Sequence, residues 1–581
     1  MTAATALHLP MTGDLGSATP TPEPELERAV QTVREHAQAF ARLPIAQKID
    51  LLRAVQAGMH RVAPAWVRAA CHAKGLPPDG PLSGEEWLAG PVITVRNLRL
   101  LIAALQAVAR AGRPPLGTGT RQLPDGRLAV RVFPSDARDG VLFAGFRCET
   151  HLLPGIDEAG ARARQAEFYQ QRDPPGRVAV ILGAGNVASI PPLDTIYKMF
   201  VEGYTAVLKM NPVNDYLGPF FVEAMAPLLQ AGYLRIVYGG ADTGRFLVEH
   251  PAVDHVHITG SDLTHDLIVW GPPGAERERR KREGDPLLKK SITSELGNVS
   301  PIVIVPGDYT SEQLWFQARN VASMVGNNAS FNCNAGKVLV TSRGWKQRET
   351  FLMLVRKALG EMPLRRAYYP GAAARYETLL SGRDRVERFG NPQGDQLPWA
   401  LVPDLDPEDR EEQLFQVEPF CGILSETALP ETDPAGFLAA ATRFCNERLW
   451  GTLNACLVVP PRLEQGSVGQ QLERSIAELR YGSVAINHWP ALVYGTVTPP
   501  WGGHPSATLQ DIQSGLGWVH NTFLLGGIEK NVMRGPIVVR PRPPWFYDHQ
   551  RAHEIGRRLV GLEASASWLQ LPGIVLQALR G

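Results

Sequence analysis

Several features that define other protein classes are scarce or missing in this sequence. Six cysteines are spread over 581 residues, without a Cys-x-x-Cys pair or a histidine-rich cluster. This argues against a zinc module and a disulfide framework, so we expect a reduced, cytoplasmic compartment. No run of 18 apolar residues occurs, and residues 1–23 lack the basic and apolar segments of a secretory signal. We therefore expect a soluble protein without a membrane span, which begins with a flexible leader over residues 1–23.

An excess of charge of one sign is also missing. The chain has 59 Lys and Arg against 58 Asp and Glu, a formal net charge of +1. This balance gives no reason to expect nucleic acid as a partner. The length exceeds what one compact core supports, so two or more domains are expected.

The first part of the chain is predicted to be helical, and a hairpin follows it. Apolar residues recur at three- and four-residue steps between Pro24 and Gly112. Residues 122–134 alternate apolar and polar positions around the turn Pro124-Asp-Gly126, which predicts a β-hairpin. Residues 141–153 form a second strand-like run.

The segment from Arg177 to Ser261 alternates strand-like and helix-like patterns. Strands are predicted at residues 178–182, 206–209, 234–238 and 256–261, with helices at residues 191–203 and 217–231 between them. This alternation is typical of a doubly wound parallel sheet, which binds ligands at the carboxyl ends of its strands. The sequence has no Gly-x-Gly-x-x-Gly, so the usual dinucleotide fingerprint gives no support.

A second α/β unit is predicted from Val299 onward. Its strands are expected at residues 302–305, 338–340, 456–459 and 484–486, and its helices include residues 311–324 and 345–359. Residues 276–290 are strongly charged, which favours a solvated insertion over a contact to a cofactor phosphate. Residues 544–581 have a helical pattern; packing on the body is our default expectation, ahead of covering a substrate entrance or binding a partner.

The main candidate for chemistry is Cys333, which lies in a turn of small and polar residues directly before a predicted strand. Cysteine is the best thiol nucleophile when its pKa is lowered or a base lies nearby. A lone cysteine is more often an inert buried thiol. This one is accompanied by Glu295-Leu-Gly-Asn298 and Ala184-Gly-Asn-Val187, with Lys209 placed 23 residues after Asn186.

These segments together resemble the aldehyde dehydrogenase superfamily, from about residue 25 to about residue 505. Further matches follow in the same order, at Glu418-Pro-Phe420, Trp450-Gly451, Asn454, Ile486-Asn487 and Pro500-Trp-Gly-Gly503. The resemblance implies an α/β fold with a Rossmann-type nucleotide-binding domain (24–120 and 152–296) and an α/β catalytic domain (297–505). It also implies oligomerisation strands (121–151 and 530–543), followed here by a helical tail (544–581).

The resemblance implies a role for each of three catalytic residues in oxidising an aldehyde to a carboxylic acid. Cys333 would attack the aldehyde carbonyl and carry the thiohemiacetal and then the thioester. Asn186 and the backbone N–H of Cys333 would stabilise the oxyanion. Glu295 would be the general base that activates water to hydrolyse the thioester.

The cofactor implied by the resemblance is NAD or NADP. The residues expected to contact it are Lys209, Gly260, Ser261, His265, Leu296, Glu418 and Phe420. The chain departs from the family pattern at four places, which marks a distant member. Pro212 stands where members that prefer NAD often carry a glutamate, so one barrier against NADP is removed. His265 replaces a common glycine, Asn298 replaces a second glycine, and Lys337-Val338 replaces a more usual Ser-Arg.

Two alternatives stay open: an acyl-CoA or acyl-group reductase of the same superfamily, and a non-catalytic structural member. Glu295 favours hydrolysis, because CoA-acylating relatives generally lack the base. An apolar tunnel for a medium or large hydrophobic aldehyde would be lined by Trp315, Phe331, Trp489 and Trp501. A hairpin near residues 122–134 pairs with a partner subunit in the resembled family, so a homodimer or homotetramer is expected.

Overall fold

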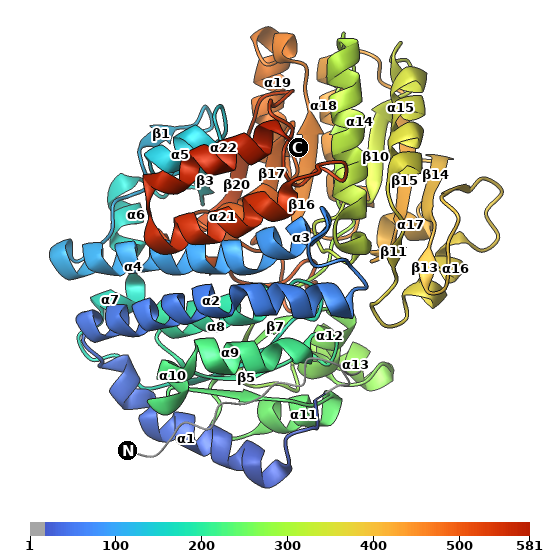
Figure 1. The fold of residues 1–581 in the computed structure, drawn as a ribbon. Coiled ribbons are helices and arrows are strands. Elements are labelled where there is room, and N and C mark those ends of the chain that lie inside the picture. The colour runs from blue at the N-terminus through green and yellow to red at the C-terminus, as the bar shows by residue number, and fades with distance from the viewer. Residues whose placement is uncertain (1–17) are drawn as a thin grey trace.

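The computed structural model describes residues 18–581 as an α/β structure built around two main sheets (Figure 1). The smaller sheet has five strands and the larger has eleven. The α/β class predicted from the sequence is confirmed. Most of the predicted leader lies outside the described residues.

The five-stranded sheet is entirely parallel, with strand order β6-β5-β4-β7-β8. Its strands are β4 (Val178–Leu182), β5 (Thr205–Lys209), β6 (Leu234–Val237), β7 (His255–Thr259) and β8 (Ser291–Glu295). The helices that connect and follow them are α8 (Ile190–Phe200), α9 (Gly218–Ala224), α10 (Ala226–Gln230), α11 (Ala241–Glu249), α12 (Asp262–Trp270) and α13 (Ala275–Glu283). The strand order reverses direction at β4, which is the switch point where such sheets bind ligands.

One predicted helix of this domain is two helices. The sequence pattern favoured a single helix over residues 217–231, but α9 ends at Ala224 and α10 begins at Ala226. Pro227 lies just after the break; it lacks a backbone N–H and disfavours helical geometry in the residue before it.

The N-terminal helices cover both faces of the small sheet, with the first helix on one face and the others on the opposite face. They are α1 (Glu23–Ala41), α2 (Ile45–Ala73), α3 (Ser83–Trp87), a π-helical turn (Leu88–Val92) and α4 (Ile93–Ala111). Among the described residues, the continuous helical segment Ser83–Ala111 is the one long and apolar enough to cross a membrane by composition. Its most apolar window is 67% buried inside the fold, as expected of a core helix.

The larger sheet has the strand order β1-β2-β3-β20-β17-β16-β9-β10-β15-β14-β12. These strands are β1 (Thr120–Gln122), β2 (Leu128–Phe133), β3 (Arg147–Leu152), β9 (Pro301–Ile304), β10 (Val338–Ser342), β12 (Glu387–Phe389), β14 (Trp399–Leu405), β15 (Ile423–Leu429), β16 (Asn454–Val458), β17 (Ser483–Ile486) and β20 (Ile528–Arg534). The run from β20 to β14 is parallel, whereas β1, β2, β3 and β12 pair antiparallel.

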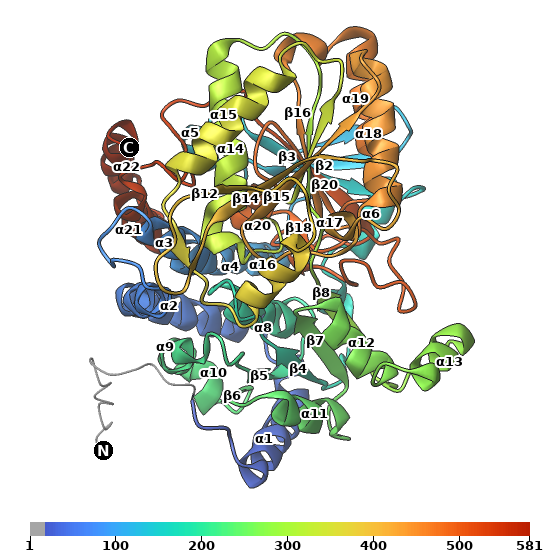
Figure 2. The ribbon, with the colours of Figure 1, turned by 90° about the vertical axis from the view of Figure 1, so that its right-hand side faces the viewer.

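Two pairs of helices cover opposite faces of this sheet, as Figure 2 shows. Helices α14 (Ser311–Gly326) and α15 (Arg348–Glu361) pack on one face, and α18 (Pro434–Arg448) and α19 (Gly466–Glu478) on the other. Leu339 of β10 belongs to the first core, and its neighbours Val338 and Val340 to the second. This alternation is what a strand buried on both faces requires.

The smaller elements complete the chain. They are α5 (Ala137–Leu142), α6 (Glu158–Arg164), α7 (Glu167–Gln170), α16 (Ala372–Leu380), α17 (Gln413–Gln416), α20 (Ala491–Thr496), β11 (Arg365–Arg366), β13 (Gln396–Leu397), β18 (Pro500–Trp501) and β19 (Val519–His520), with single helical turns at Asp215–Leu217, Asn327–Ser330, Pro461–Leu463 and Trp568–Gln570.

The predicted hairpin is confirmed, with β1 and β2 paired from Thr120 opposite Val130. The strand-like run 141–153 is partly wrong, because its first residues end helix α5 and only Arg147–Leu152 is extended. Asp136 explains the helix: its carboxylate accepts the backbone N–H groups of Arg138 and Asp139 as an N-cap. The hairpin joins the large sheet of its own chain through β3 and β20. Pairing with a partner subunit stays a prediction.

The C-terminal tail is helical, as its pattern predicted, and packs on the body. Helix α21 (Ala552–Ser565) lies against α3 and α4, and α22 (Leu571–Leu579) packs on α21 (Figure 1). The contact with α3 is close, because a Cβ added to Gly84 would overlap Ala552.

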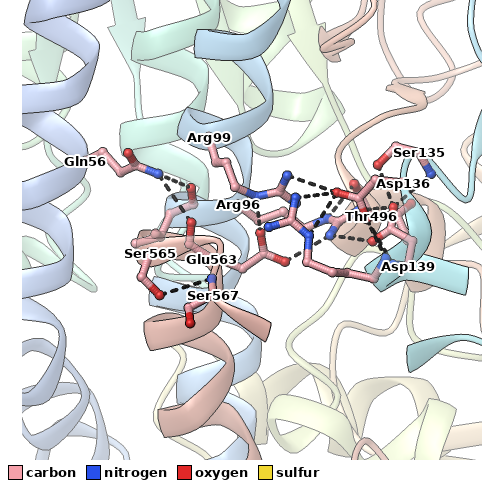
Figure 3. Close-up of polar contacts among 12 residues, drawn as sticks. Gln56, Arg96, Arg99, Ser135, Asp136, Asp139, Thr496, Glu563, Ser565 and Ser567 are labelled. Atoms are coloured by element: carbon pink, nitrogen blue, oxygen red, sulfur yellow. Dashed lines mark hydrogen bonds and ion pairs between the residues drawn. The ribbon is translucent and has the colours of Figure 1, made fainter. Parts of the chain in front are cut away.

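An ion network fixes the tail to the body (Figure 3). Glu563 of α21 accepts a hydrogen bond from Arg96 Nη1 at 2.9 Å and another from Arg99 Nε at 2.6 Å. Arg96 also donates to Asp139 Oδ2 at 2.9 Å, and Arg99 to Asp136 Oδ2 at 3.3 Å. Arg96, Asp139 and Glu563 are buried, so each charge depends on its partners.

Candidate active site

A cavity of about 1470 Å³ lies at the carboxyl ends of β4, β5, β7 and β8 and extends to the second α/β unit. The parallel register explains why distant segments meet there. Leu182 pairs with Lys209 on one side and Ile258 on the other, and Thr259 pairs with Glu295. Residues that follow these strands therefore share one edge of the sheet.

The cavity brings together most of the site residues predicted from the sequence. Those that line it are Asn186, Lys209, Gly260, Ser261, Glu295, Leu296, Cys333, Glu418 and Phe420. His265 is the exception: it is buried in α12 and does not line the cavity. Its Nδ1 lies 3.6 Å from Asp266 Oδ1. The structure therefore places the His265 side chain outside the cavity.

Cys333 occupies a turn between the helical turn Asn327–Ser330 and strand β10, as predicted. Three residues just before it have positive φ angles: Asn328 (53°), Ala329 (55°) and Ser330 (68°). Non-glycine residues rarely adopt this region, and a run of three implies that the surroundings hold the backbone in place.

A buried group of polar residues holds this turn. Lys74 Nζ donates to Glu86 Oε1 at 2.7 Å and to Asn328 Oδ1 at 2.9 Å. Asn328 donates through Nδ2 to the carbonyls of Asn186 and Phe331, each at 2.9 Å. Neither Lys74 nor Glu86 was predicted from the sequence. Other charged residues, such as Arg68 and Glu85, lie close to them in the chain, so nothing in the local pattern marks these two.

Asn186 faces the cavity from the segment after β4, and it is buried. Its Nδ2 donates to the carbonyl of Phe331 at 3.1 Å. An amide nitrogen carries two hydrogens, so the second one is available for an oxygen in the cavity. The backbone oxygen of Asn186 accepts from the turn that carries Cys333, which couples the two positions.

The pKa values of the candidate nucleophile and the candidate base are both raised. Burial raises the pKa of the Cys333 thiol, the negative charges of Glu418 and Glu295 add to this, and Lys337 opposes it. Burial also raises the pKa of Glu295 well above its usual range, reinforced by the charge of Asp194 and a hydrogen bond with it. A raised pKa makes the Glu295 carboxylate a stronger proton acceptor.

Lys337 is a buried cation behind the nucleophile. Its Nζ donates to the carbonyl of Ser330 at 3.3 Å, and burial lowers its pKa while Glu418 opposes that shift. Burial raises the pKa of Glu418 to about 7, with Lys337 acting in the opposite direction. Lys337 therefore provides positive charge to both Cys333 and Glu418.

The cavity walls suit a dinucleotide. Glu418 Oε1 is buried, and no described residue gives it a hydrogen bond, so it can accept from a ribose hydroxyl. Gly297 allows Glu418 to approach, since a Cβ at this glycine would overlap Glu418 Oε2. Arg375 fixes the loop by donating to the carbonyls of Pro419 and Phe420, each at 3.3 Å. Burial lowers the pKa of Lys209 to about 8, and its ammonium can donate to a ribose.

The aromatic residues expected to form a tunnel do not line this cavity. The four are Trp315, Phe331, Trp489 and Trp501. Trp489, for example, is buried and donates to the carbonyl of Asn334 at 2.6 Å. Tyr369 and Phe420 line the cavity instead, with ring centroids 5.0 Å apart.

Comparisons with known proteins found similarity to aldehyde dehydrogenases. The model of the aldehyde dehydrogenase family matches residues 147–364. An aldehyde dehydrogenase of a Fusarium species is 27% identical over 147 residues, which are 24% of this chain and 29% of the relative's length.

Solved structures share the fold over most of the chain. An NADP-dependent glyceraldehyde-3-phosphate dehydrogenase from Bacillus halodurans is similar with a TM-score of 0.60 and 17% identity, covering 89% of this chain and 93% of that one. Lactaldehyde dehydrogenase from Escherichia coli is similar with a TM-score of 0.59 and 15% identity, covering 89% and 92%.

Proposed function

Because the chain is a distant member of the aldehyde dehydrogenase superfamily, we propose that it is an oxidoreductase that converts an aldehyde to a carboxylic acid with NAD or NADP. One observation supports this above the others. Cys333, Glu295 and Asn186 come from three separate segments, and they line one cavity together with Lys209 and Glu418.

The chain's own residues would hold the dinucleotide along the strand ends. Lys209 and Glu418 would bind ribose hydroxyls, while Gly260 and Ser261 admit the phosphates near the N-terminus of α12. Phe420 would pack beside the nicotinamide ring. When bound, the oxidised cofactor supplies the hydride acceptor and a positive charge that favours the Cys333 thiolate.

The covalent steps would take place on Cys333. Its thiolate adds to the aldehyde carbon, and the resulting oxyanion accepts hydrogen bonds from Asn186 Nδ2 and the backbone N–H of Cys333. Loss of hydride leaves a thioester. Glu295 then takes a proton from water, which attacks the thioester carbonyl, and Cys333 leaves with the release of the acid.

The test is absorbance of the reduced nicotinamide with a panel of aldehydes and either NAD or NADP. Cys333→Ala should abolish reduction but retain dinucleotide binding by calorimetry, because the thiol is not needed to bind the cofactor. Glu295→Gln should give a burst of reduced cofactor followed by slow turnover, because only thioester hydrolysis needs the base.

Cys445→Ala is the matched control, since Cys445 is a buried thiol in α18 away from the cavity. Its activity should equal that of the parent. Equal activity in Cys333→Ala and Cys445→Ala would refute the proposed nucleophile. Oxidation of NADPH by an acyl-CoA, without aldehyde oxidation, would assign the protein to acyl reduction instead.

A further inference from the structure

Polar side chains occupy one face of the strand pair β7 and β8. His255, His257 and Thr259 of β7 stand opposite Ser291, Thr293 and Glu295 of β8 in register. Successive side chains of a strand point to opposite faces, so these six share one face. We call this set the β7–β8 polar ladder; it reaches Glu295 at the cavity.

The ladder contains a continuous chain of short polar contacts. His255 Nδ1 lies 2.8 Å from Ser291 Oγ, and His255 Nε2 lies 3.0 Å from Thr293 Oγ1. The same hydroxyl lies 2.9 Å from His257 Nδ1. Ser291 is exposed, whereas both histidines are buried. The chain therefore connects the surface to the interior.

At its inner end the ladder meets two carboxyl groups. His257 Nε2 lies 3.4 Å from Asp194 Oδ2 and 3.9 Å from Glu295 Oε1. Asp194 projects from α8 and also accepts a hydrogen bond from Thr259 Oγ1 at 2.9 Å. Within residues 18–581, neither His257 Nε2 nor Glu295 Oε1 has a hydrogen-bond partner. The facing atoms of Asp194, His257 and Glu295 lie within 4.8 Å of one another, so a proton that reaches Glu295 has both Asp194 and His257 close by.

Other charged and polar groups face the ladder, but none of them takes the place of the proton at Asp194 and Glu295. Lys198 of α8 directs its ammonium to Glu202, at 2.9 and 3.0 Å, and Tyr494 of α20 lies 2.9 Å from Ser189 Oγ through its hydroxyl. The remaining titratable, charged or polar groups that act on Asp194, His255 or Glu295 are Cys333, Arg177, Trp501 and His520.

We propose that the β7–β8 polar ladder is a proton-transfer path between Glu295 and the surface at Ser291, with Asp194 sharing the proton at the inner end. The path rests on the proposed function of Cys333 and Glu295. Asp194, His255, His257 and Thr293 are new functional residues in this assignment.

Thioester hydrolysis leaves one proton on Glu295 when Cys333 leaves as a thiolate, and this proton needs a way out. Water loses one proton to Glu295 as its oxygen bonds to the acyl carbon, and the carbon–sulfur bond breaks to release the Cys333 thiolate. The carboxylic acid leaves, and Glu295 still carries the proton. Transfer by way of Asp194 to His257, whose Nε2 lies 3.4 Å from Asp194 Oδ2, then through Thr293 and His255 to Ser291 and bulk water, restores the carboxylate for the next turnover. No oxidant or reductant takes part in this step.

The protonation states of the groups agree with this role. Burial and Asp194 raise the pKa of Glu295, so its proton is retained until an acceptor takes it. Burial lowers the pKa of His255 to about 2, so its ring is neutral. A neutral imidazole relays a proton by accepting at one nitrogen and releasing from the other.

The experiment uses hydrolysis of p-nitrophenyl acetate by the full chain, which needs no nicotinamide. The nitrophenolate burst measures acylation of Cys333, and the following slow phase measures deacylation. Thr293→Val removes the bridging hydroxyl with little change of shape. It should slow deacylation by roughly 10- to 100-fold, within the range of general acid–base effects, and leave the burst unchanged. Added imidazole, a small proton carrier, should restore the slow phase in proportion to its concentration.

Thr205→Val is the matched control, since Thr205 is a buried threonine of β5 in the same sheet but outside the ladder. It should deacylate like the parent. His255→Phe interrupts the path at a point farther from the cavity and should slow deacylation as much as Thr293→Val. With two variants, the path can still be tested if one of them does not fold.

Three results would overturn the path. Parental deacylation in both Thr293→Val and His255→Phe would show that no proton uses the ladder. Slow deacylation that imidazole never restores would show a merely structural role. A change in parental deacylation on treatment with a chelator would show that Asp194, His257 and Glu295 hold a divalent cation.

The same experiment distinguishes failure of the path from failure of the proposed function. A Cys333-dependent burst without any aldehyde-driven reduction of nicotinamide would refute the dehydrogenase and still test the path. A parent without a Cys333-dependent burst would overturn both.

Discussion

Replacing Glu563 by Gln should destabilise the fold more than any exposed charge change in the same helix. Glu563 is buried and accepts from Arg96 at 2.9 Å and Arg99 at 2.6 Å. Gln is nearly isosteric, so packing is retained while one negative charge is lost. Two buried or half-buried guanidinium groups then lose their shared carboxylate.

The size of the stability loss depends on the ion pairs that Arg96 and Arg99 keep. Removing one partner of a buried ion pair costs about 3–5 kcal/mol. Arg96 keeps Asp139 at 2.9 Å, and Arg99 keeps Asp136 at 3.3 Å. The loss should therefore lie at the lower end, about 3 kcal/mol.

The assay is urea denaturation followed by tryptophan fluorescence, comparing the transition midpoints of parent and variant. Glu554→Gln is the control in the same helix, because Glu554 is partly exposed and its contacts with His553 and Arg557 lie at 3.9 and 4.0 Å. It should change stability by less than about 0.5 kcal/mol. If Glu563→Gln and Glu554→Gln have the same midpoint, the network does not hold the tail as argued.

Two further predictions concern buried charges. Lys337→Met should raise the thiol pKa of Cys333, because the lysine opposes the shift caused by burial; alkylation by iodoacetamide should be slower at each pH from 7 to 9, and an unchanged pH profile would contradict this. Burial acts to raise the pKa of Asp139, but the charge and hydrogen bond of Arg96 outweigh it and hold the pKa below its usual range. This stabilisation is present above the unfolded-state pKa of about 4 and is lost as pH falls through the lower folded value. Unfolding midpoints measured from pH 6 to pH 2 should therefore fall less in Asp139→Asn than in the parent, and parallel curves would exclude the contribution.

Three of the site candidates were predictable because each lies at or just after the end of a strand of the small sheet. Asn186 follows β4, Lys209 ends β5 and Glu295 ends β8. In a parallel sheet the ends of neighbouring strands meet at one edge, so a correct strand assignment places these side chains together. Cys333 and Glu418 reach the same cavity from the second unit, and family resemblance supplied that link.

The direction of the His265 side chain could not be predicted from its place in the sequence. It lies in the first turn of α12, close in sequence to Ser261, yet it is fully buried. Residues of a helix point in directions that change by about 100° at each step. Proximity to the helix N-terminus therefore does not decide which side chain faces a ligand.

The β7–β8 polar ladder was not predicted from the sequence. The sequence does not give the register that sets His257 opposite Thr293, and a shift by one residue would turn the polar face away. The bond from Lys74 to Asn328 joins residues 254 apart in the chain, and nothing in the local pattern indicates it.

The position of β20 in the larger sheet has a consequence for synthesis of the protein. This strand lies between β3 and β17, and it pairs with both. On the ribosome, β3 and β17 are made before residues 528–534 emerge, so each keeps an open edge until then. Open edges of hydrophobic strands associate with other chains. The nascent protein is therefore vulnerable to aggregation until β20 emerges, and a chaperone that shields sheet edges would act before that point.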